Sequence, residues 1–373
     1  MVTLAELVRV SNQVAATSSR LAKIRSLADF LRPLEREEIE IALPYLSGDI
    51  RQGKLAVGYA ALQSARTGAA ASPTLGLRDV DATFQKLKSV KGKGAAERRS
   101  ALLRELFKRA MADEQDFLVR LMVGELRQGA LEGIMVEAVA AAASLPPADV
   151  RRAVAFAGVI APVASAALSG GASALAQFSV QLMQPVLPML AQPAEDTKEA
   201  LAALGTALVE WKLDGARVQV HKSGDDVRLY TRNLNDVTAR APEIVSAARG
   251  LGARSLILDG EAIALRANGR PQPFPVTMSR FGSQQDPHAA DVRLSVFFFD
   301  CLYLDGSTLF DHPTRERRDA LVTAVPKSMV TPAVITADAD EAERFYQDAL
   351  VAGHEGVMAK ALDAPYEAGR RGA

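Results

Sequence analysis

Lys212 is the residue of this chain whose surroundings could make it a nucleophile. It follows the apolar run 207–209 and precedes Asp214-Gly215, after which residues 217–221 alternate between polar and apolar side chains. This order predicts a strand, a tight turn at Asp-Gly and a second strand. A lysine amine attacks poorly while it is protonated, and it becomes reactive where desolvation or nearby cations lower its pKa. From this segment alone, a solvated lysine of a hairpin remains the alternative.

Four short motifs, taken in chain order, point to one class of reaction. They are Lys-x-Asp-Gly-x-Arg at 212–217, Leu-Asp-Gly-Glu at 258–261, Phe-Phe-Phe-Asp at 297–300 and Glu-Gly-Val-Met-Ala-Lys at 355–360. Their order resembles motifs I, III, IIIa and IV of the nucleotidyltransferases that form a lysyl-nucleoside monophosphate: DNA ligases, RNA ligases and mRNA capping enzymes. The chain resembles above all the ATP-dependent DNA ligases of archaeal and eukaryotic type, which some bacteria also carry. No Walker-type Gly-x-x-x-x-Gly-Lys-Ser/Thr occurs, so we expect no P-loop.

This resemblance implies a three-step reaction with ATP and Mg²⁺ as cofactors and nicked double-stranded DNA as partner. Unprotonated Lys212 Nζ would attack the α-phosphorus of ATP, expel pyrophosphate and form a lysyl-AMP phosphoramidate. AMP would then pass to the 5′-phosphate of the nick, and the 3′-hydroxyl would finally attack and expel AMP. Each step is a phosphoryl transfer, which enzymes accelerate mainly by positioning the groups and neutralising their charge.

The resemblance also implies roles for individual residues. The implied nucleotide contacts are Glu210 at the adenine amino edge, Arg217 and Arg232 at ribose and phosphate, Glu261 at the ribose, Phe299 stacked on adenine, Lys360 at the α-phosphate, and Arg371. The implied metal ligands are Glu261, Glu355 and Asp214, and Asp214 could also help to place the 3′-hydroxyl. Plainer interpretations exist: Glu210 as a surface carboxylate, Arg232 as a solvated charge at a strand end, and Phe299 as a core aromatic.

The hydrophobic period changes once along the chain, near residue 176. Before it, apolar residues recur at three- and four-residue spacing, which predicts an all-helical domain of short elements. The apolar stretch 153–168 is shorter than the roughly 20 residues of a membrane span, and we interpret it as one buried helix of a bundle. After it, the pattern predicts strands at 217–221, 227–230, 255–259, 261–265, 294–304 and 357–360, and helices at 243–248, 315–322 and 340–351.

The predicted fold class is therefore a multidomain protein with two different architectures. An all-α N-terminal DNA-binding domain covers residues 1–176, a proline-rich linker covers 177–193, and an α+β nucleotidyltransferase (adenylation) domain with antiparallel sheets covers 194–373.

A basic loop in the helical part could bind a phosphate. Residues 86–109 hold nine basic and two acidic residues around Lys91-Gly92-Lys93-Gly94. The backbone amides of a glycine loop at a helix start, flanked by lysines, suit a phosphate, which makes Lys91 and Lys93 candidate DNA contacts. A solvated helix face is an equal alternative.

A second stretch of the helical part, 120–133, resembles the Arg/Lys-x-Leu-x-Gly-x-Leu-Arg-x-Gly segment of ligase DNA-binding domains. It implies that Arg120, Arg127 and Gly129 contact DNA largely through its phosphates, without sequence preference. The plainer interpretation is close helix packing at Gly124 and a helix end at Gly129.

Composition adds a charge asymmetry to this organisation. The chain of 373 residues is formally neutral, yet residues 1–110 hold 19 Lys and Arg against 11 Asp and Glu, which fits a basic part that faces DNA.

The single cysteine, Cys301, excludes an internal disulfide and a Cys-cluster zinc site of the kind NAD-dependent ligases usually contain, and we expect it to be an inert core residue. Without a signal-peptide pattern, we expect a cytoplasmic, nucleoid-associated monomer that does not bind membranes.

The family pattern continues beyond the motifs found here. It has a motif V with one or two phosphate-contacting lysines and then an OB-fold domain, whereas the sequence stops at Ala373, which predicts a truncated ligase that is only partly active. Two alternatives remain open. An RNA ligase or capping guanylyltransferase shares the motifs, although the long helical leader argues against it. A catalytically weak fragment could still bind nicked DNA in a salt-sensitive manner.

Overall fold

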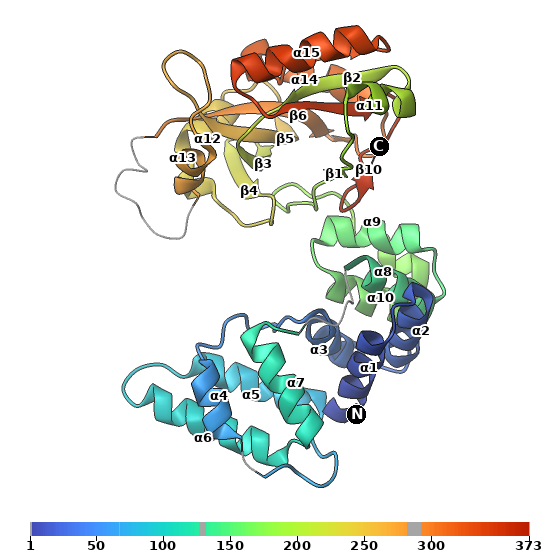
Figure 1. The fold of residues 1–373 in the computed structure, drawn as a ribbon, viewed down its shortest axis with the longest axis vertical. Coiled ribbons are helices and arrows are strands. Elements are labelled where there is room, and N and C mark those ends of the chain that lie inside the picture. The colour runs from blue at the N-terminus through green and yellow to red at the C-terminus, as the bar shows by residue number, and fades with distance from the viewer. Residues whose placement is uncertain (1, 67, 127–131, 282–291, 373) are drawn as a thin grey trace. The chain divides into compact units, whose positions relative to one another are not determined.

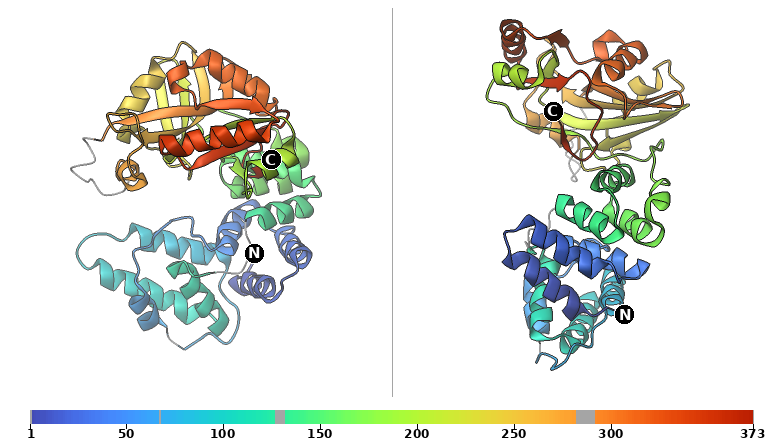
Figure 2. Two further views of the ribbon diagram at one scale, coloured as in Figure 1. Left: turned by 45° about the horizontal axis from the view of Figure 1, so that its top comes forward. Right: turned by 90° about the vertical axis from the view of Figure 1, so that its right-hand side faces the viewer.

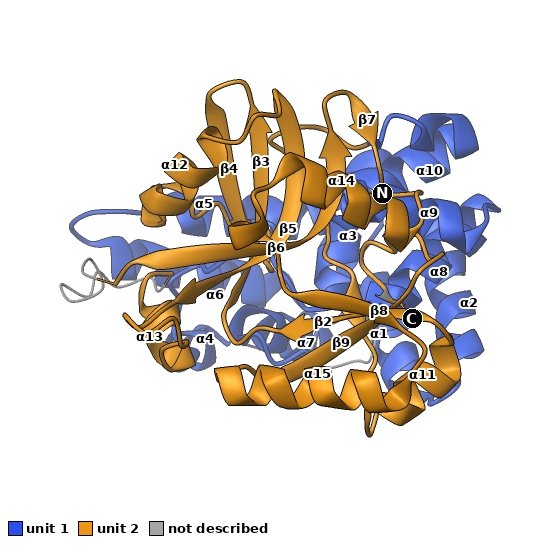
Figure 3. Ribbon diagram, turned by 90° about the horizontal axis from the view of Figure 1, so that it is seen from above, with its two compact units in different colours: residues 1–179 blue, residues 180–373 orange. Residues whose placement is uncertain are grey.

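The protein consists of two compact units. The computed structural model describes residues 2–66, 68–126, 132–281 and 292–372, and it divides into Met1–Ser179 and Val180–Ala373 (Figure 3). Helices make up the first unit, and helices with antiparallel sheets make up the second (Figure 1). The predicted fold class is confirmed.

Ten helices form the described part of the first unit (Figure 2). They are α1 (Leu4–Ala16), α2 (Arg20–Leu31), α3 (Arg36–Ser47), α4 (Tyr59–Ala65), α5 (Leu77–Ser89), α6 (Ala95–Arg109), α7 (Ala112–Val123), α8 (Glu132–Ala143), α9 (Pro147–Ala157) and α10 (Ile160–Leu175). The first begins with a capping box, in which Thr3 Oγ1 accepts the Glu6 N–H and the Glu6 carboxylate accepts the Thr3 N–H. In the part of the chain that the structure describes, no helix is both long and apolar enough to cross a bilayer.

The apolar stretch 153–168 belongs to two helices, so the prediction of one buried helix is wrong. α9 ends at Ala157 and α10 begins at Ile160. Between them Gly158 adopts a left-handed φ of 75° and donates its N–H to the carbonyl of Val154 at 2.9 Å. A glycine in this conformation ends a helix at little cost, whereas apolar periodicity alone does not show the break.

Antiparallel sheets form the centre of the second unit. One sheet has the strand order β4-β3-β5-β6-β7, another has the order β8-β2-β9, and β1 pairs with β10 in parallel. The strands are β1 (Leu190–Ala191), β2 (Ala207–Lys212), β3 (Ala216–Ser223), β4 (Asp226–Thr231), β5 (Ser255–Ala264), β6 (Leu294–Leu304), β7 (Ser307–Thr308), β8 (Ala333–Thr336), β9 (Gly356–Ala361) and β10 (Arg371–Gly372). The helices are α11 (Thr197–Leu204), α12 (Pro242–Arg249), α13 (Phe274–Ser279), α14 (Thr314–Ala324) and α15 (Ala339–Ala352), with short 3-10 turns η1 (Thr238–Arg240) and η3 (Lys327–Met329).

β2 and β3 do not form the hairpin predicted at Asp214-Gly215. β2 pairs with β8 and β9, whereas β3 pairs with β4 and β5, so this turn carries the chain from one sheet to the other. Gly215 is required by close packing, because a Cβ there would lie 2.8 Å from Cγ1 of Ile263 and 2.9 Å from Cγ of Glu261. The Asp-Gly pair predicts that the chain turns here, but it does not predict which strands pair with each other after the turn.

The two strands predicted at 255–259 and 261–265 form one continuous strand, β5. Its register against β6 shifts between Asp259 and Gly260. An added Cβ at Gly260 would lie 2.7 Å from the carbonyl oxygen of Phe297, so the glycine allows the two backbones to approach closely.

The proline-rich connector is bound to the second unit over residues 183–191. The N–H of Met183 donates to Nδ1 of His221 at 3.1 Å, and the N–H of Val186 donates to Oε1 of Gln219 at 2.9 Å. Because Nδ1 of His221 accepts a hydrogen bond, its Nε2 carries the proton and donates to Oε1 of Gln219 at 2.8 Å. This part of the connector is therefore ordered by side chains of β3.

Because His221 is buried, we expect the second unit to lose stability in acid. Burial lowers the pKa of His221 to about 3, whereas an exposed histidine titrates near about 6.5. The unfolded chain therefore binds a proton that the folded chain does not. This histidine leaves the free energy of unfolding unchanged above about pH 6.5 and lowers it as the pH falls from there towards 3, by at most about 1.4 kcal/mol per pH unit.

Urea denaturation at several pH values between about 7.5 and 4.5 measures this slope. His221→Gln is expected to flatten it by one proton, even though the variant is less stable throughout. His312→Gln changes an exposed histidine and is the matched control, with an unchanged slope. An equal slope in wild type and His221→Gln would contradict the assignment.

Candidate active site

Alternation along β2 and β9 separates a core face from a polar face. Val209 on β2 and Ala359 on β9 pack with residues of α11 and α15. The side chains of Glu210 and Lys212 therefore point to the opposite face, as successive residues of a strand do. The antiparallel register places Lys360 opposite Leu208, on the same polar face.

The five-stranded sheet presents a second set of site residues by the same alternation. Val218 on β3 and Phe298 on β6 lie in its buried core, so their neighbours Arg217 and Phe299 point to the other face. Arg217 lies directly opposite Glu261 in the register of β3 and β5. Phe298, rather than Phe299, is the core aromatic of this run.

Lys212 is half-exposed at the end of β2 and forms an ion pair with Glu355. The backbone supports this pair, because the N–H of Glu355 donates to the carbonyl of Lys212 at 3.1 Å. The carboxylate of Glu355 thus engages Nζ of Lys212. The ion pair must therefore open before Nζ can act as a nucleophile.

If Lys212 is the nucleophile that the motifs predict, Gly215→Ala should reduce its capture of adenylate at least tenfold. The substitution should also lower the free energy of unfolding by about 1–3 kcal/mol, the usual range for overpacking. The added Cβ would press on the Ala262 carbonyl as well as on the side chains named above, so the turn after Lys212 must shift. AMP incorporation and urea denaturation measure the two effects. Gly252→Ala is the control, because nothing lies within 4 Å of its added Cβ, and wild-type behaviour in Gly215→Ala would refute the packing argument.

Lys360 connects the two polar faces. Its ammonium forms an ion pair with Glu210, donates to the carbonyl of Phe299 at 3.5 Å and lies 4.9 Å from the centre of the Phe299 ring. Glu210 is only 3% exposed, and burial raises the pKa of its carboxyl, an effect that the charges of Lys360 and Arg318 oppose. Glu210 is thus a buried carboxylate held between two cations, not a surface residue.

Arg217 is held by a network of polar groups. Nε and Nη2 donate to the two carboxylate oxygens of Asp259 at 3.1 and 2.6 Å, and Nη1 donates to the carbonyl of Met189 at 2.6 Å. The hydroxyl of Tyr366 accepts from Nη2 at 3.1 Å and donates to Asp259 at 2.7 Å. Burial alone would lower the pKa of Arg217, but Asp259 raises it above its usual range. The guanidinium lies 5.4 Å from the Phe299 ring centre and supports that ring from one side.

Glu261 is a second carboxyl group of this site whose pKa is raised. Burial raises the pKa of Glu261 to about 8, although Arg217 and Lys212 partly oppose this effect, and Asp259 and Asp214 add to it. The residues that the structure describes contain no cluster of three or more His, Cys, Asp or Glu side chains arranged to hold a metal ion. Glu261, Glu355 and Asp214 therefore remain a prediction as metal ligands.

Two further predicted nucleotide contacts are Arg232 and Arg371. Arg232 is exposed in the turn after β4, and no hydrogen bond joins its side chain to another described residue. The backbone of Arg371 pairs with Leu190 in the β1–β10 ladder. The roles predicted for both arginines stay predictions.

Two arginines of α6 hold the predicted phosphate-binding loop in shape. Arg98 donates to the carbonyls of Lys93 at 3.0 Å and Lys91 at 2.8 Å, and Arg99 donates to the carbonyl of Val90 at 2.6 Å. Lys91 and Lys93 are exposed, so their ammonium groups are accessible. Gly92 and Gly94 take left-handed φ angles of 82° and 74°, which explains the glycines of this loop.

The second DNA-binding prediction falls partly on residues that the structure does not describe. Arg120 is exposed in the last turn of α7, whereas Arg127 and Gly129 lie outside the described residues. α7 ends at Val123, with Gly124 in a left-handed φ of 75°. Among the described residues, nothing lies within 4 Å of a Cβ built on Gly124, so they give no support to close helix packing as the reason for this glycine.

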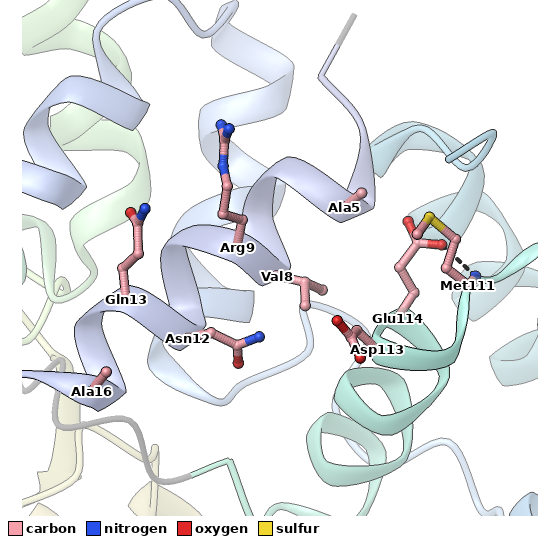
Figure 4. A pocket seen from close by; sticks show the side chains of 9 residues that line it. All are labelled: Ala5, Val8, Arg9, Asn12, Gln13, Ala16, Met111, Asp113 and Glu114. Carbon is pink, nitrogen blue, oxygen red and sulfur yellow. Dashed lines mark hydrogen bonds between the residues drawn. The ribbon is translucent and has the colours of Figure 1, made fainter. Parts of the chain in front are cut away.

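A hollow of about 440 Å³ lies between α1 and α7 of the first unit (Figure 4). Its lining residues are Ala5, Val8, Arg9, Asn12, Gln13, Ala16, Met111, Asp113 and Glu114. Glu114 is 1% exposed, its carboxylate accepts the N–H of Met111 at 2.7 Å, and burial raises its pKa. Glu114 therefore caps α7, and the hollow shares no residue with the predicted site.

Three residues of the site did not stand out in the sequence. Asp259 and Tyr366 hold Arg217, and Arg318 faces Glu210. The position of Asp259, two residues before Glu261 on a strand, was a usable signal. Arg318 follows Arg317 on α14, and nothing in that pair distinguishes the arginine that faces the site.

Comparisons with known proteins cover both units. The family described as "ATP dependent DNA ligase domain" matches residues 188–373, and the family described as "DNA ligase N terminus" matches residues 51–140. Proteins named "Probable DNA ligase" from Anaeromyxobacter sp. and Mycolicibacterium paratuberculosis are 54% and 52% identical over 99% and 100% of this chain and 72% of each relative. A solved structure named Pmar-Lig_Pre shares the fold over 98% of this chain and 76% of its own, with a TM-score of 0.59 at 18% identity.

These likenesses agree with the geometry of the site. The relatives align along both units rather than at the motifs alone, and residues of the four motifs meet between the two sheets of the second unit. The protein is a ligase, and the chain belongs to the family of ATP-dependent DNA ligases.

Proposed function

We propose that the protein seals nicks in double-stranded DNA through a covalent Lys212–AMP intermediate, with ATP as the AMP donor. The observation that carries this proposal is the half-exposed Lys212 amine on a sheet face that also holds Glu210 and Lys360. The Phe299 ring on the other sheet, flanked by two cations, offers a surface on which a purine could stack.

In the first step, Lys212 separates from Glu355 and loses its proton. Nζ forms a bond to the α-phosphorus of ATP, and the bond from that phosphorus to the oxygen bridging to the β-phosphorus breaks, so that pyrophosphate leaves. In the second step, an oxygen of the DNA 5′-phosphate displaces Lys212 from the AMP phosphorus. In the third step, the 3′-hydroxyl attacks the 5′-phosphorus, loses its proton and releases AMP.

Each of the side chains described above would have its own role in binding the nucleotide. Glu210 would accept a hydrogen bond from the adenine amino group, and Lys360 would move to the α-phosphate. Arg217 has most of its donors engaged by Asp259, Tyr366 and Met189, so we assign it chiefly the task of holding the ring of Phe299 and the connector in place.

Mg²⁺ fits the donor set of the site. In phosphoryl-transfer sites it is held by one or two carboxylates, and substrate phosphates and water complete its shell. Glu355 and Glu261 are hard oxygen donors whose charges act on Lys212. The bound ion would neutralise charge on the phosphates, and Glu261 would hold it in its ionised form.

Labelled ATP tests the proposal. The protein is incubated with ATP labelled at the α-phosphate and with Mg²⁺, and nicked duplex DNA is then added. The label is expected first on the protein, then on the DNA 5′-end, and finally in free AMP as the nick is sealed. Label that never enters the protein, or that stays there in the presence of nicked DNA, would contradict the first or the second step respectively. GTP replaces ATP in a parallel reaction, because a capping-type enzyme would capture GMP.

The exposed lysines of the α5–α6 loop predict the DNA-binding component. Lys91→Ala/Lys93→Ala is expected to weaken binding to nicked duplex several-fold at low salt and to reduce the salt dependence by up to about two phosphate contacts. Arg36→Ala, an exposed cation on α3, is the control. Unchanged affinity and salt dependence in the double variant would favour the solvated-face interpretation.

A further inference from the structure

Three buried polar atoms near the proposed adenine site have no hydrogen-bond partner among the described residues: Glu210 Oε2, Arg318 Nη1 and Thr331 Oγ1. Nη1 of Arg318 lies 4.0 Å from Oε2 of Glu210, and Nη2 of Arg318 donates to the carbonyl of Thr331 at 2.8 Å. The side chains of Arg318 and Glu210 are 14% and 3% exposed. The hydrogen bond to Thr331 therefore holds Arg318 beside the Glu210 carboxylate.

Lys360 is the other cation beside Glu210, but the proposed function gives it a second role elsewhere in the site. In this structure its ammonium pairs with Glu210. In the proposed function, on which this inference rests, Lys360 contacts the α-phosphate of ATP. An ammonium that moves to the phosphate weakens its contact with Glu210, and a buried carboxylate without a cation tends to take up a proton.

Protonation would reverse the hydrogen-bonding preference of Glu210. An ionised carboxylate only accepts hydrogen bonds, which suits the 6-amino group of adenine and repels the 6-keto oxygen of guanine or hypoxanthine. A protonated carboxyl can donate to that oxygen. The choice between 6-amino and 6-keto purines therefore depends on a cation that stays beside Glu210 when Lys360 moves.

We propose that Arg318 is that cation: a positioning residue that keeps Glu210 ionised and oriented in the nucleotide complex, and thereby sets the preference for ATP over 6-keto purine nucleotides. An arginine keeps its charge in a protein interior, and a lysine that stays paired with a buried carboxylate keeps its charge too. The charged groups that act on Glu210 are Lys360 from β9, Arg318 from α14 and Asp300 from β6, and Asp300 opposes ionisation. Asp300 is itself paired with Arg317, so with Lys360 displaced Arg318 is the cation that remains to act on Glu210.

Nucleotide binding can be measured without catalysis. Isothermal titration calorimetry measures this binding directly. ATP and inosine triphosphate (ITP) are titrated in the presence of EDTA, so that no transfer occurs. Arg318→Gln is expected to weaken ATP binding at least tenfold and to lower the ATP-to-ITP preference at least tenfold. Arg318→Lys retains the charge, so it should keep most of the preference. Arg315→Gln changes an exposed arginine of the same helix and should behave as wild type.

A double-mutant cycle separates positioning from general damage. A carboxamide at residue 210 needs no counter-charge, so Arg318→Gln should leave the ATP-to-ITP preference unchanged on a Glu210→Gln background. A wild-type preference in Arg318→Gln, or the same loss on both backgrounds, overturns the role of Arg318. If Arg318→Gln does not fold, Arg318→Lys decides, and loss of the preference in that variant overturns the proposal. A wild-type protein that binds ATP and ITP equally refutes base recognition by Glu210 itself, which is a failure of the proposed function.

Discussion

Lys212→Ala is expected to form no AMP adduct and to lower the rate of adenylate capture by roughly five orders of magnitude, the scale seen when the nucleophile of a covalent enzyme is removed. Lys360 is not expected to replace it, because in the proposed function its ammonium contacts the α-phosphate as a cation rather than as a nucleophile. Intact-protein mass spectrometry after incubation with ATP and Mg²⁺ measures the adduct directly.

Two further variants complete this experiment. Lys212→Arg keeps the positive charge beside Glu355 but offers no neutral amine, so it should be as inactive as the alanine variant. Lys198→Ala removes an exposed lysine on α11 and should form the adduct at the wild-type rate. An adduct on Lys212→Ala comparable to that of the control would show that another residue is the nucleophile.

The largest effect on stability is expected from Arg317, a buried arginine on α14. Its side chain is 2% exposed, and Nε and Nη2 donate to the carboxylate of Asp300 at 2.8 and 3.2 Å. Nη1 donates to the carbonyls of His312 at 2.6 Å and Ala364 at 3.0 Å. Arg317→Met leaves the buried Asp300 carboxylate without its counter-charge and removes a donor from the carbonyls of His312 and Ala364, so the free energy of unfolding should fall by about 3–5 kcal/mol.

Urea denaturation followed by circular dichroism measures this loss. Arg315→Met, on the exposed side of the same helix, should change stability by no more than about 0.5 kcal/mol. Asp300→Asn combined with Arg317→Met removes the buried carboxylate charge that has lost its partner. The double variant should therefore recover part of the lost free energy of unfolding. A single Arg317→Met variant as stable as wild type would show that the ion pair contributes nothing net.

The sequence predicted elements that local patterns determine. β6 runs over the predicted residues 294–304, because an apolar and aromatic run of that length, interrupted only by Ser295 and Asp300, has few other solutions in an α+β domain. The change from helical to strand periodicity was equally visible. The short β8 was missed, because Ala333–Thr336 gives only four residues of pattern and gains its stability by pairing with β2.

The sequence could not predict which elements meet. The Asp-Gly turn after Lys212 was predicted. The pairing of β2 with β9, however, joins residues that lie more than a hundred positions apart, and the pattern of neighbouring residues does not predict such a pairing. The same holds for Arg318, whose contact with Glu210 depends on how α14 packs on β6. Motif order predicted the nucleotide-facing residues, whereas the side chains that hold them follow only from the three-dimensional structure.

Cys301 gives the protein a practical property. It is fully buried in β6, next to Asp300, and burial raises the pKa of its thiol to about 12. Alkylating reagents attack thiolates, so the folded protein should behave almost as if it had no cysteine. A cysteine introduced anywhere on the surface can then carry a fluorophore or spin label without removal of the native one, and slow alkylation of Cys301 would record each opening of the strand that carries Phe299.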